Sequence, residues 1–106
     1  MARPDAALRL LGLAARAGAL LPGTERVREA VRAGSMRLVI VAADASANSL
    51  DKLVPLLEKR RVPHVVRFDR AQLGDAVGKA PLSAVGLTDA SFAARLQELI
   101  REEQAE

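Results

Sequence analysis

The chain has 106 residues, half of them hydrophobic and only two aromatic, with a formal net charge of +3 and a sequence pI of about 10.2. The absence of cysteine excludes disulfides, thiol catalysis and cysteine-ligated zinc. The shortage of aromatic side chains argues against binding single strands by base stacking. The length predicts one domain over residues 1–106, with a core that needs neither disulfide nor metal.

The positive charge is concentrated in the first part of the chain. Residues 1–43 carry seven basic and three acidic side chains, whereas residues 90–106 carry two basic and four acidic ones. This asymmetry is typical either of a solvated, arginine-rich surface or of a surface that meets a polyanion. The apolar stretch 8–21 is interrupted by Arg9 and Arg16, so it does not form a signal or membrane-spanning segment. We interpret it as a first helix and expect a cytoplasmic protein.

Helical and extended segments alternate from the N-terminus. A first helix opens at Pro4 or Asp5 and ends at Gly18. A short extended piece over 19–21 leads to a Pro-Gly turn, and a second helix runs over 24–33 with Thr24 as its cap. The inward face of this second helix is expected to contain Val27, Ala30, Val31 and Gly34, because these residues follow helical spacing.

The middle of the chain predicts a strand and then a helix. Residues 38–43 form a continuous apolar run with a β-branched centre, which indicates a strand buried on both faces. After a polar turn over 44–48, a helix is expected over 49–60. Pro55 either kinks this helix or marks its true start.

The last part of the chain continues the alternation. It contains a strand over 64–68, a short helix over 71–77 capped by Asp69 and closed by Gly78, a loop, and a strand over 83–87. Thr88 or Asp89 caps the final helix, and residues 102–106 are expected to fray. The regular alternation predicts an α/β fold, a three-layer α/β/α sandwich.

Two isolated residues, Asp44 and His64, could take part in catalysis or metal binding, but neither is accompanied by the further groups that such a site requires. Asp44 ends a core strand, but it lacks a second carboxylate and a glycine-rich phosphate loop, so we interpret it as a turn cap. His64 is the only histidine, and no group at ligand or triad spacing accompanies it. The sequence therefore predicts no catalytic residue, no metal, no cofactor and no small-molecule substrate.

The start of the second helix is a stronger lead. Its N-terminus offers unpaired N–H groups and a partial positive charge. Arg28 and Arg32 share a face that must point to solvent or to a partner. Together these features predict a corner that can bind phosphate, although such corners also occur without a ligand.

Four stretches in unbroken order carry a family resemblance. They are residues 11–18 (LGLAARAG), residues 23–34 (GTERVREAVRAG), residues 38–46 (LVIVAADAS) and residues 73–78 (LGDAVG). In these stretches the chain resembles the kink-turn-binding ribosomal-protein superfamily, and within it the bacterial YlxQ-type branch of RNA-binding proteins.

The resemblance implies a mixed sheet of about four strands between helices, and non-catalytic binding of structured RNA, either kink-turn-like or ribosomal. The ribosome is an implied partner, and a membrane is not. The first implied RNA-binding segment contains Gly23, Thr24, Glu25, Arg26 and Glu29. The second contains Lys79, Ala80, Pro81 and Leu82.

Three residues depart from the family's RNA-binding motif. Glu25 stands where the motif has asparagine, Arg26 where it has glutamate, and Glu29 where it has lysine. An ionised glutamate only accepts hydrogen bonds, whereas asparagine also donates them. We expect Arg26 and Arg28 to supply replacement donors and Arg32 to extend the row. These departures favour a related structured RNA, such as ribosomal RNA, over a standard kink-turn.

A protein-interaction module on the same fold is the alternative. In that case RNA recognition is lost, and the binding surface is apolar. Its expected residues are Leu20, Leu21, Pro22, Pro81 and Leu82.

Overall fold

The computed structural model describes the backbone of residues 4–105 and the side chains of residues 6–105. Within that range the helices are α1 (Pro4–Arg16), α2 (Thr24–Arg32), α3 (Ala47–Lys59), α4 (Arg70–Ala76) and α5 (Ala90–Ala105). The strands are β1 (Leu20–Pro22), β2 (Leu38–Val41), β3 (His64–Val66) and β4 (Ala84–Leu87). α1 begins at Pro4, and the side chains of Pro4 and Asp5, the two residues predicted to open this helix, lie outside the described ones.

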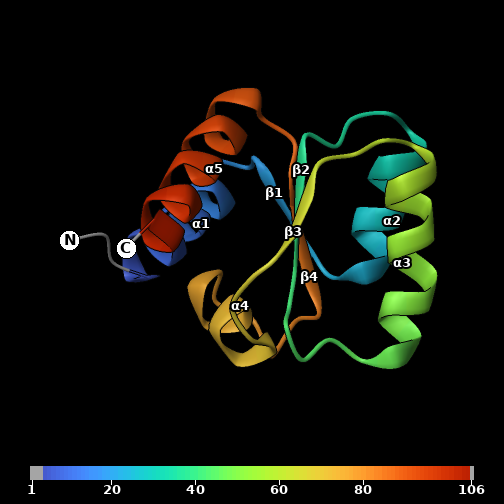
Figure 1. The fold of residues 1–106 in the computed structure, drawn as a ribbon, viewed down its shortest axis with the longest axis horizontal. Coiled ribbons are helices and arrows are strands. Elements are labelled where there is room, and N and C mark those ends of the chain that lie inside the picture. Colours follow the sequence, from blue (N-terminus) through green and yellow to red (C-terminus); the bar gives the residue numbers. More distant parts are fainter. Residues whose placement is uncertain (1–3, 106) are drawn as a thin grey trace.

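The four strands form one mixed sheet in the order β1-β4-β2-β3. β2 and β3 are parallel, whereas β4 is antiparallel to both of its neighbours. Figure 1 shows α1, α4 and α5 on one face of the sheet and α2 and α3 on the other. The predicted three-layer α/β/α sandwich with a mixed four-stranded sheet is therefore confirmed.

The sheet separates two hydrophobic cores, and β2 contributes to both. Leu38 and Ile40 pack under α1 and α5, whereas Val39 and Val41 pack under α2 and α3. Successive side chains of a strand point to opposite faces, so an uninterrupted apolar run fits only a strand covered on both sides. The strand predicted over 38–43 is confirmed for Leu38–Val41, whereas Ala42 lies beyond its end and Ala43 is in an exposed turn.

The last helix extends further than the sequence predicts. α5 continues to Ala105 and does not end near Arg101. The reason is a long-range ion pair, in which Arg67 Nη2 donates to Glu103 Oε2 at 2.6 Å. The Glu103 side chain is only 4% exposed. This contact fixes the last turn of α5 against the segment that follows β3.

None of the helices within residues 4–105 combines the length and the apolar character that crossing a bilayer requires.

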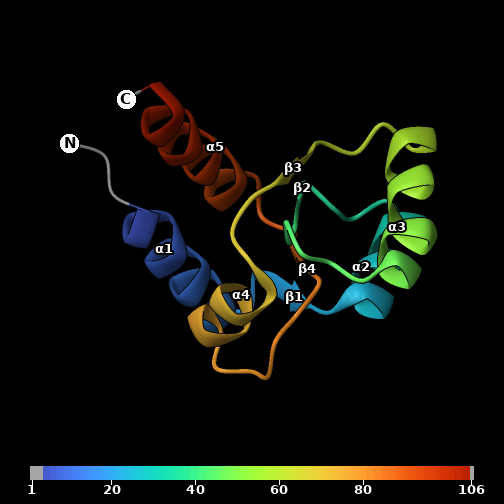
Figure 2. The ribbon, with the colours of Figure 1, turned by 60° about the horizontal axis from the view of Figure 1, so that its bottom comes forward.

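α2 and α3 lie side by side and run in the same direction (Figures 1 and 2). At their N-terminal ends the Thr24 hydroxyl is 3.2 Å from the Ser49 hydroxyl oxygen. At their C-terminal ends Arg60 Nη1 lies 3.5 Å from the carbonyl oxygen of Arg32. Pro55 lies inside α3, so it does not mark the start of that helix. Both helices consequently present their N-termini at one end of the layer and their C-termini at the other.

Arg61 ends α3 in an unusual backbone conformation. Its φ is +56°, and the N–H of Val62 donates to the carbonyl of Leu57 at 2.9 Å. This is the geometry of a helix terminus at which glycine is usually found, because a Cβ clashes in the left-handed region. The chain therefore places an arginine where the backbone favours glycine.

We expect the substitution Arg61→Gly to raise the free energy of unfolding by about 0.5–1 kcal/mol, because relief of the left-handed strain exceeds the added entropy of the unfolded chain. Arg60→Gly is the matched control. Arg60 has φ −89° and ψ 0°, so glycine relieves no strain there and should cost about 0.5–1 kcal/mol. Urea titrations of both variants measure the difference. A less stable Arg61→Gly protein would contradict this account.

Candidate nucleic-acid interface

Gly23 forms the corner between β1 and α2. Its backbone has φ 98° and ψ 150°, a conformation that is essentially restricted to glycine. Its N–H donates to the carbonyl of Ala84 at 2.9 Å, and its carbonyl accepts from the N–H of Val27 at 3.1 Å. The corner is therefore tied to the start of β4 while it opens the first turn of α2. We call this end of the sheet, where β1 and β2 finish and β4 begins, the Gly23 edge.

Gly23 is the residue at the N-cap position of α2, and the prediction that Thr24 caps this helix is wrong. Thr24 is already helical, and its hydroxyl is used in the contact with Ser49 of α3. No side chain among the described residues caps the helix. The first N–H groups of α2 are therefore available to an acceptor from outside.

The loop over residues 79–82 folds back onto α4. The N–H of Lys79 donates to the carbonyl of Gly74 at 2.8 Å, and the N–H of Leu82 donates to the carbonyl of Arg70 at 3.0 Å. A Cβ on Gly74 would overlap the carbonyl oxygen of Ala80 and would lie 2.8 Å from that of Lys79. The first glycine of the Leu-Gly-x-x-x-Gly stretch is thus needed for close backbone approach.

The two predicted RNA-binding segments lie at the same end of the sheet, the Gly23 edge. The loop leads into β4, whose first residue, Ala84, accepts the hydrogen bond from Gly23. Figure 2 shows the loop running up to β4 beside the junction of β1 and α2. Residues about 60 positions apart in the chain (Gly23 and residues 79–82) therefore lie at one end of the sheet. Lys79, Ala80 and Pro81 are exposed there, and Leu82 is half-buried.

Glu25 is held between two cations. Arg28 Nη1 lies 3.1 Å from Glu25 Oε2, and Lys52 Nζ lies 3.5 Å from Glu25 Oε1. The Arg28 side chain is only 20% exposed in this arrangement. The helical spacing of Glu25 and Arg28 predicts their pairing. No local pattern indicates Lys52, because only the packing of α3 beside α2 brings it to this corner.

The arginines of α2 do not form one row, contrary to the prediction. Residues of a helix are separated by about 100°, so Arg26 lies roughly 160° around the axis from Arg28. Arg32 is on the side of Arg28, but it lies in the last turn, at the other end of the helix. Arg26 and Glu29 are both exposed. Of the three arginines, only Arg26 and Arg28 lie near the Gly23 edge.

The apolar set considered for protein binding does not form an open surface. Leu20 is 7% exposed and belongs to the core under α1 and α5. Leu21 and Leu82 are half-buried and pack against the two cores. Only Pro81 of this set is exposed, while Pro22 is half-buried. Apart from Pro81, these side chains are buried or half-buried within the fold.

A family model described as the Ribosomal protein L7Ae/L30e/S12e/Gadd45 family matches residues 5–97, a range that includes the whole Gly23 edge. The chain belongs to this family. The resemblance stated from the sequence is thereby confirmed.

Individual members of the family are similar over most of their length. The RNA-binding protein YlxQ of Enterococcus faecium is 36% identical over 89% of this chain and 90% of the relative. The large ribosomal subunit protein eL8 of Thermoplasma volcanium is 33% identical over 78% of this chain and 69% of the relative. A solved structure of a protein of unknown function from Bacillus halodurans C has a TM-score of 0.83 and 41% identity, covering 90% of this chain and 96% of that one.

Asp44 has a structural role in this family member. Its Oδ1 accepts from the backbone N–H of Arg70 at 2.8 Å, and its Oδ2 lies 3.5 Å from Arg70 Nε. The backbone hydrogen bond and the arginine lower the pKa of Asp44 below its ordinary value of 3.8. Asp44 therefore helps to cap α4, the helix that carries the 79–82 loop, and this tie weakens only as the pH falls below the ordinary value.

The remaining candidate residues are dispersed. His64 Nδ1 lies 2.9 Å from the carbonyl oxygen of Val62, in a half-buried position. Among the described residues, no three His, Asp or Glu side chains are grouped as metal ligands.

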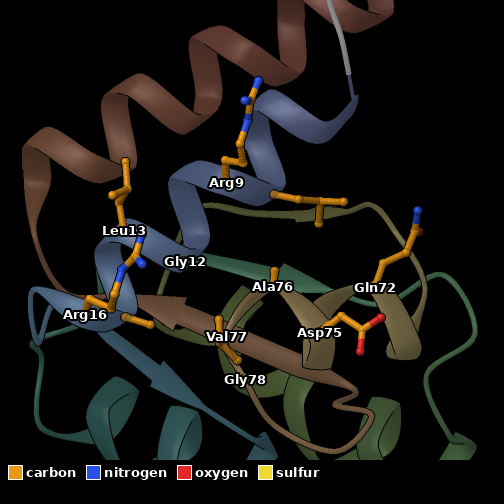
Figure 3. Close-up of a pocket in the computed structure, with 11 residues that line it drawn as sticks. Arg9, Gly12, Leu13, Arg16, Gln72, Asp75, Ala76, Val77 and Gly78 are labelled. Atoms are coloured by element: carbon orange, nitrogen blue, oxygen red, sulfur yellow. The ribbon is translucent and has the colours of Figure 1, made fainter.

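A hollow of about 750 Å³ lies between α1 and α4 (Figure 3). Gly12 lets the two helices approach, because a Cβ there would meet the carbonyl oxygen of Ala76 at 2.8 Å. Leu13, which is 50% exposed, and Arg16 line the hollow from α1, and Asp75 lines it from α4. None of the residues that the sequence predicts as RNA-binding lines this hollow.

Proposed function

We propose that this protein binds structured RNA without catalysing a reaction, and that the Gly23 edge is its primary RNA-binding surface. The observation that carries the proposal is the hydrogen bond between Gly23 and Ala84. It holds the uncapped start of α2 beside the 79–82 loop, and these are the two segments that the family resemblance implicates. The names of the relatives support the same function, since one is an RNA-binding protein and another is a large ribosomal subunit protein.

The edge combines the groups that recognition of a folded RNA requires. The free N–H groups of the first turn of α2, at the positive end of its dipole, donate to phosphate or base oxygens. Arg26 and Lys79 add exposed cations. Such contacts position the RNA, whereas the shape of the loop selects an unstacked or bent segment.

Glu25 determines which RNA fits best. Its carboxylate is shared by Arg28 and Lys52, so the corner does not present an isolated negative charge. It still accepts and cannot donate hydrogen bonds. We therefore propose a structured ribosomal RNA whose base edges differ from those of a standard kink-turn, with the ribosome as the partner.

Replacing Arg26 and Lys79 with glutamine tests the proposal. We expect binding to ribosomal RNA fragments to weaken by about tenfold or more, and the slope of log K against log salt to fall by about 1.5, because two phosphate contacts are lost. Both side chains are exposed, so the unfolding transition should not move. The measurement is crosslinking to RNA in cells with sequencing of the attached fragments, followed by binding assays on those fragments.

The matched control replaces Arg16 and Arg101 with glutamine. These two exposed arginines lie on the α1 and α5 side of the sheet, and their loss changes the net charge equally. If the edge variant and this control retain the same RNA, the Gly23 edge is not the binding surface. Recovery of a stoichiometric protein partner with no attached RNA would instead support the protein-interaction alternative.

A further inference from the structure

A second cationic surface lies at the end of the α2 and α3 layer opposite the Gly23 edge. Its members are all exposed, and they come from the end of α2, the residue before β2 and the end of α3. We call Arg32, Arg37, Lys59, Arg60 and Arg61 the basic end patch. Arg37, Arg60 and Arg61 border a hollow of about 390 Å³, and Val31 and Val62 also line it.

Within the described part of the chain, the patch has no carboxylate partners for its charge. Among the described residues, no carboxylate lies within ion-pair distance of any of these five cations. Other arginines of the same chain do find partners, as Arg67 does with Glu103 and Arg95 with Glu98. Arg16, Arg26, Lys79 and Arg101 also have no such partner among the described residues, so what distinguishes the patch is that five unpaired cations come from adjoining segments.

Compensation of the helix dipoles does not explain the whole patch. α2 and α3 both end here, and each helix end carries about half a negative charge. Glu58 is the one carboxylate in the adjoining segments 32–37 and 58–63. Five cations facing these groups leave about three positive charges uncompensated, at a cost in mutual repulsion that solvent reduces but does not remove.

The backbone conformation of Arg61 indicates that this charge serves to bind a ligand. It occupies the left-handed position at which glycine would be the less strained residue. Side chains kept in strained backbone positions are concentrated at binding sites. Phe68 has the same conformation, with φ +63°, and packs against the core under α1 and α5, whereas Arg61 is exposed and belongs to neither core. A ligand therefore explains the arginine at this position better than the stability of α3 does.

We propose that the basic end patch binds the phosphodiester backbone of a second RNA segment, separate from the segment at the Gly23 edge. This inference rests on the proposed RNA-binding function. α3 spans the distance between the two surfaces, and its 13 residues correspond to about 20 Å. The protein thus joins two parts of a folded RNA, one at each end of the same helical layer.

The composition of the patch favours RNA over an acidic protein. Four of the five cations are arginine, whose planar fork matches phosphate oxygens in pairs. Val62 is half-buried and Pro63 is exposed in the lining of the hollow, so these two side chains offer an apolar contact to a ribose or base. An acidic polypeptide can pair its carboxylates with the arginines, but it gains little binding energy from the apolar hollow.

A blunt RNA duplex is the probe, and Arg37→Gln with Arg60→Gln is the patch variant. We expect this variant to bind the duplex about tenfold more weakly than the parent at low salt, with the salt slope reduced by about 1.5. Arg61→Gly should also weaken binding although it relieves strain, a result that misfolding cannot produce. The Arg16→Gln, Arg101→Gln protein is the charge-matched control, and the variant of Arg26 and Lys79 reports on the Gly23 edge separately.

Loss of duplex binding in the patch variant, with the RNA fragments at the Gly23 edge still bound, supports the proposal. Equal duplex binding by the patch variant and the control overturns it and leaves the proposed function intact. Displacement of the duplex by polyglutamate at equal charge concentration also overturns it, because the patch would then prefer acidic chains. If the parent binds no fragment at the Gly23 edge, the proposed function fails independently of the patch.

Discussion

Replacing Gly74 with alanine is expected to lower the free energy of unfolding by about 2–3 kcal/mol. Alanine is intrinsically the better helix former by about 1 kcal/mol, but its methyl group would overlap the carbonyl oxygen of Ala80. The obstacle is backbone, which cannot rotate away as a side chain can. The 79–82 loop must therefore move off α4, and RNA binding at the Gly23 edge should weaken as well.

Chemical denaturation followed by circular dichroism measures the change, with Gly78→Ala as the control. Gly78 has φ +72°, and no heavy atom lies within 4 Å of the place that a methyl group would take. Its replacement therefore costs only the left-handed strain of about 1 kcal/mol. A Gly74→Ala protein as stable as the parent would show that the loop does not pack on α4 as described.

Replacing Gly23 with alanine is expected to cost about 2 kcal/mol of stability and to abolish most RNA binding. The conformation at φ 98° and ψ 150° is closed to other residues. A Cβ forces the corner to change, which breaks the hydrogen bond to Ala84 and turns the start of α2 away from the 79–82 loop. Binding should fall more than the stability loss accounts for at a temperature where the variant remains folded.

Gly18→Ala serves as the comparison for Gly23→Ala. Gly18 has φ +75° and follows α1, away from the Gly23 edge. It should lose about 1 kcal/mol of stability and retain full RNA affinity. Parallel binding and denaturation curves separate the two effects. Equal RNA affinities for the two variants would show that the Gly23 corner is not part of the binding surface.

The elements that can be predicted are those whose signals are local. The apolar run of β2 and the spacing of Val27, Ala30 and Val31 each identify an element and its buried face. The prediction that Asp69 caps α4 is confirmed, since Asp69 accepts from the N–H of Gln72 at 2.7 Å. These signals depend on residues within a few positions of one another, and helix and strand periodicity expresses them directly.

The candidate site can be predicted only in part. The sequence places Gly23 and the 79–82 loop in one site through a family resemblance, but nothing local predicts the hydrogen bond from Gly23 to Ala84. It also misplaces the N-cap at Thr24, because the competing contact with Ser49 comes from another helix. The expected arginine row fails for a different reason, which helical geometry already fixes: at about 100° per residue Arg26 and Arg28 lie on nearly opposite sides of α2, and Arg32 lies in its last turn.

The order of the elements, their inward faces and the family can all be obtained from the amino-acid sequence, because they follow from short-range periodicity and motif spacing. Which charges of different elements meet is decided only by the tertiary structure. Lys52 joins Glu25, Glu103 secures the last turn of α5, and the ends of α2 and α3 gather five cations that have no carboxylate partner among the described residues. Such groupings depend on the direction in which packed helices run, and that direction is set by how the sheet is connected.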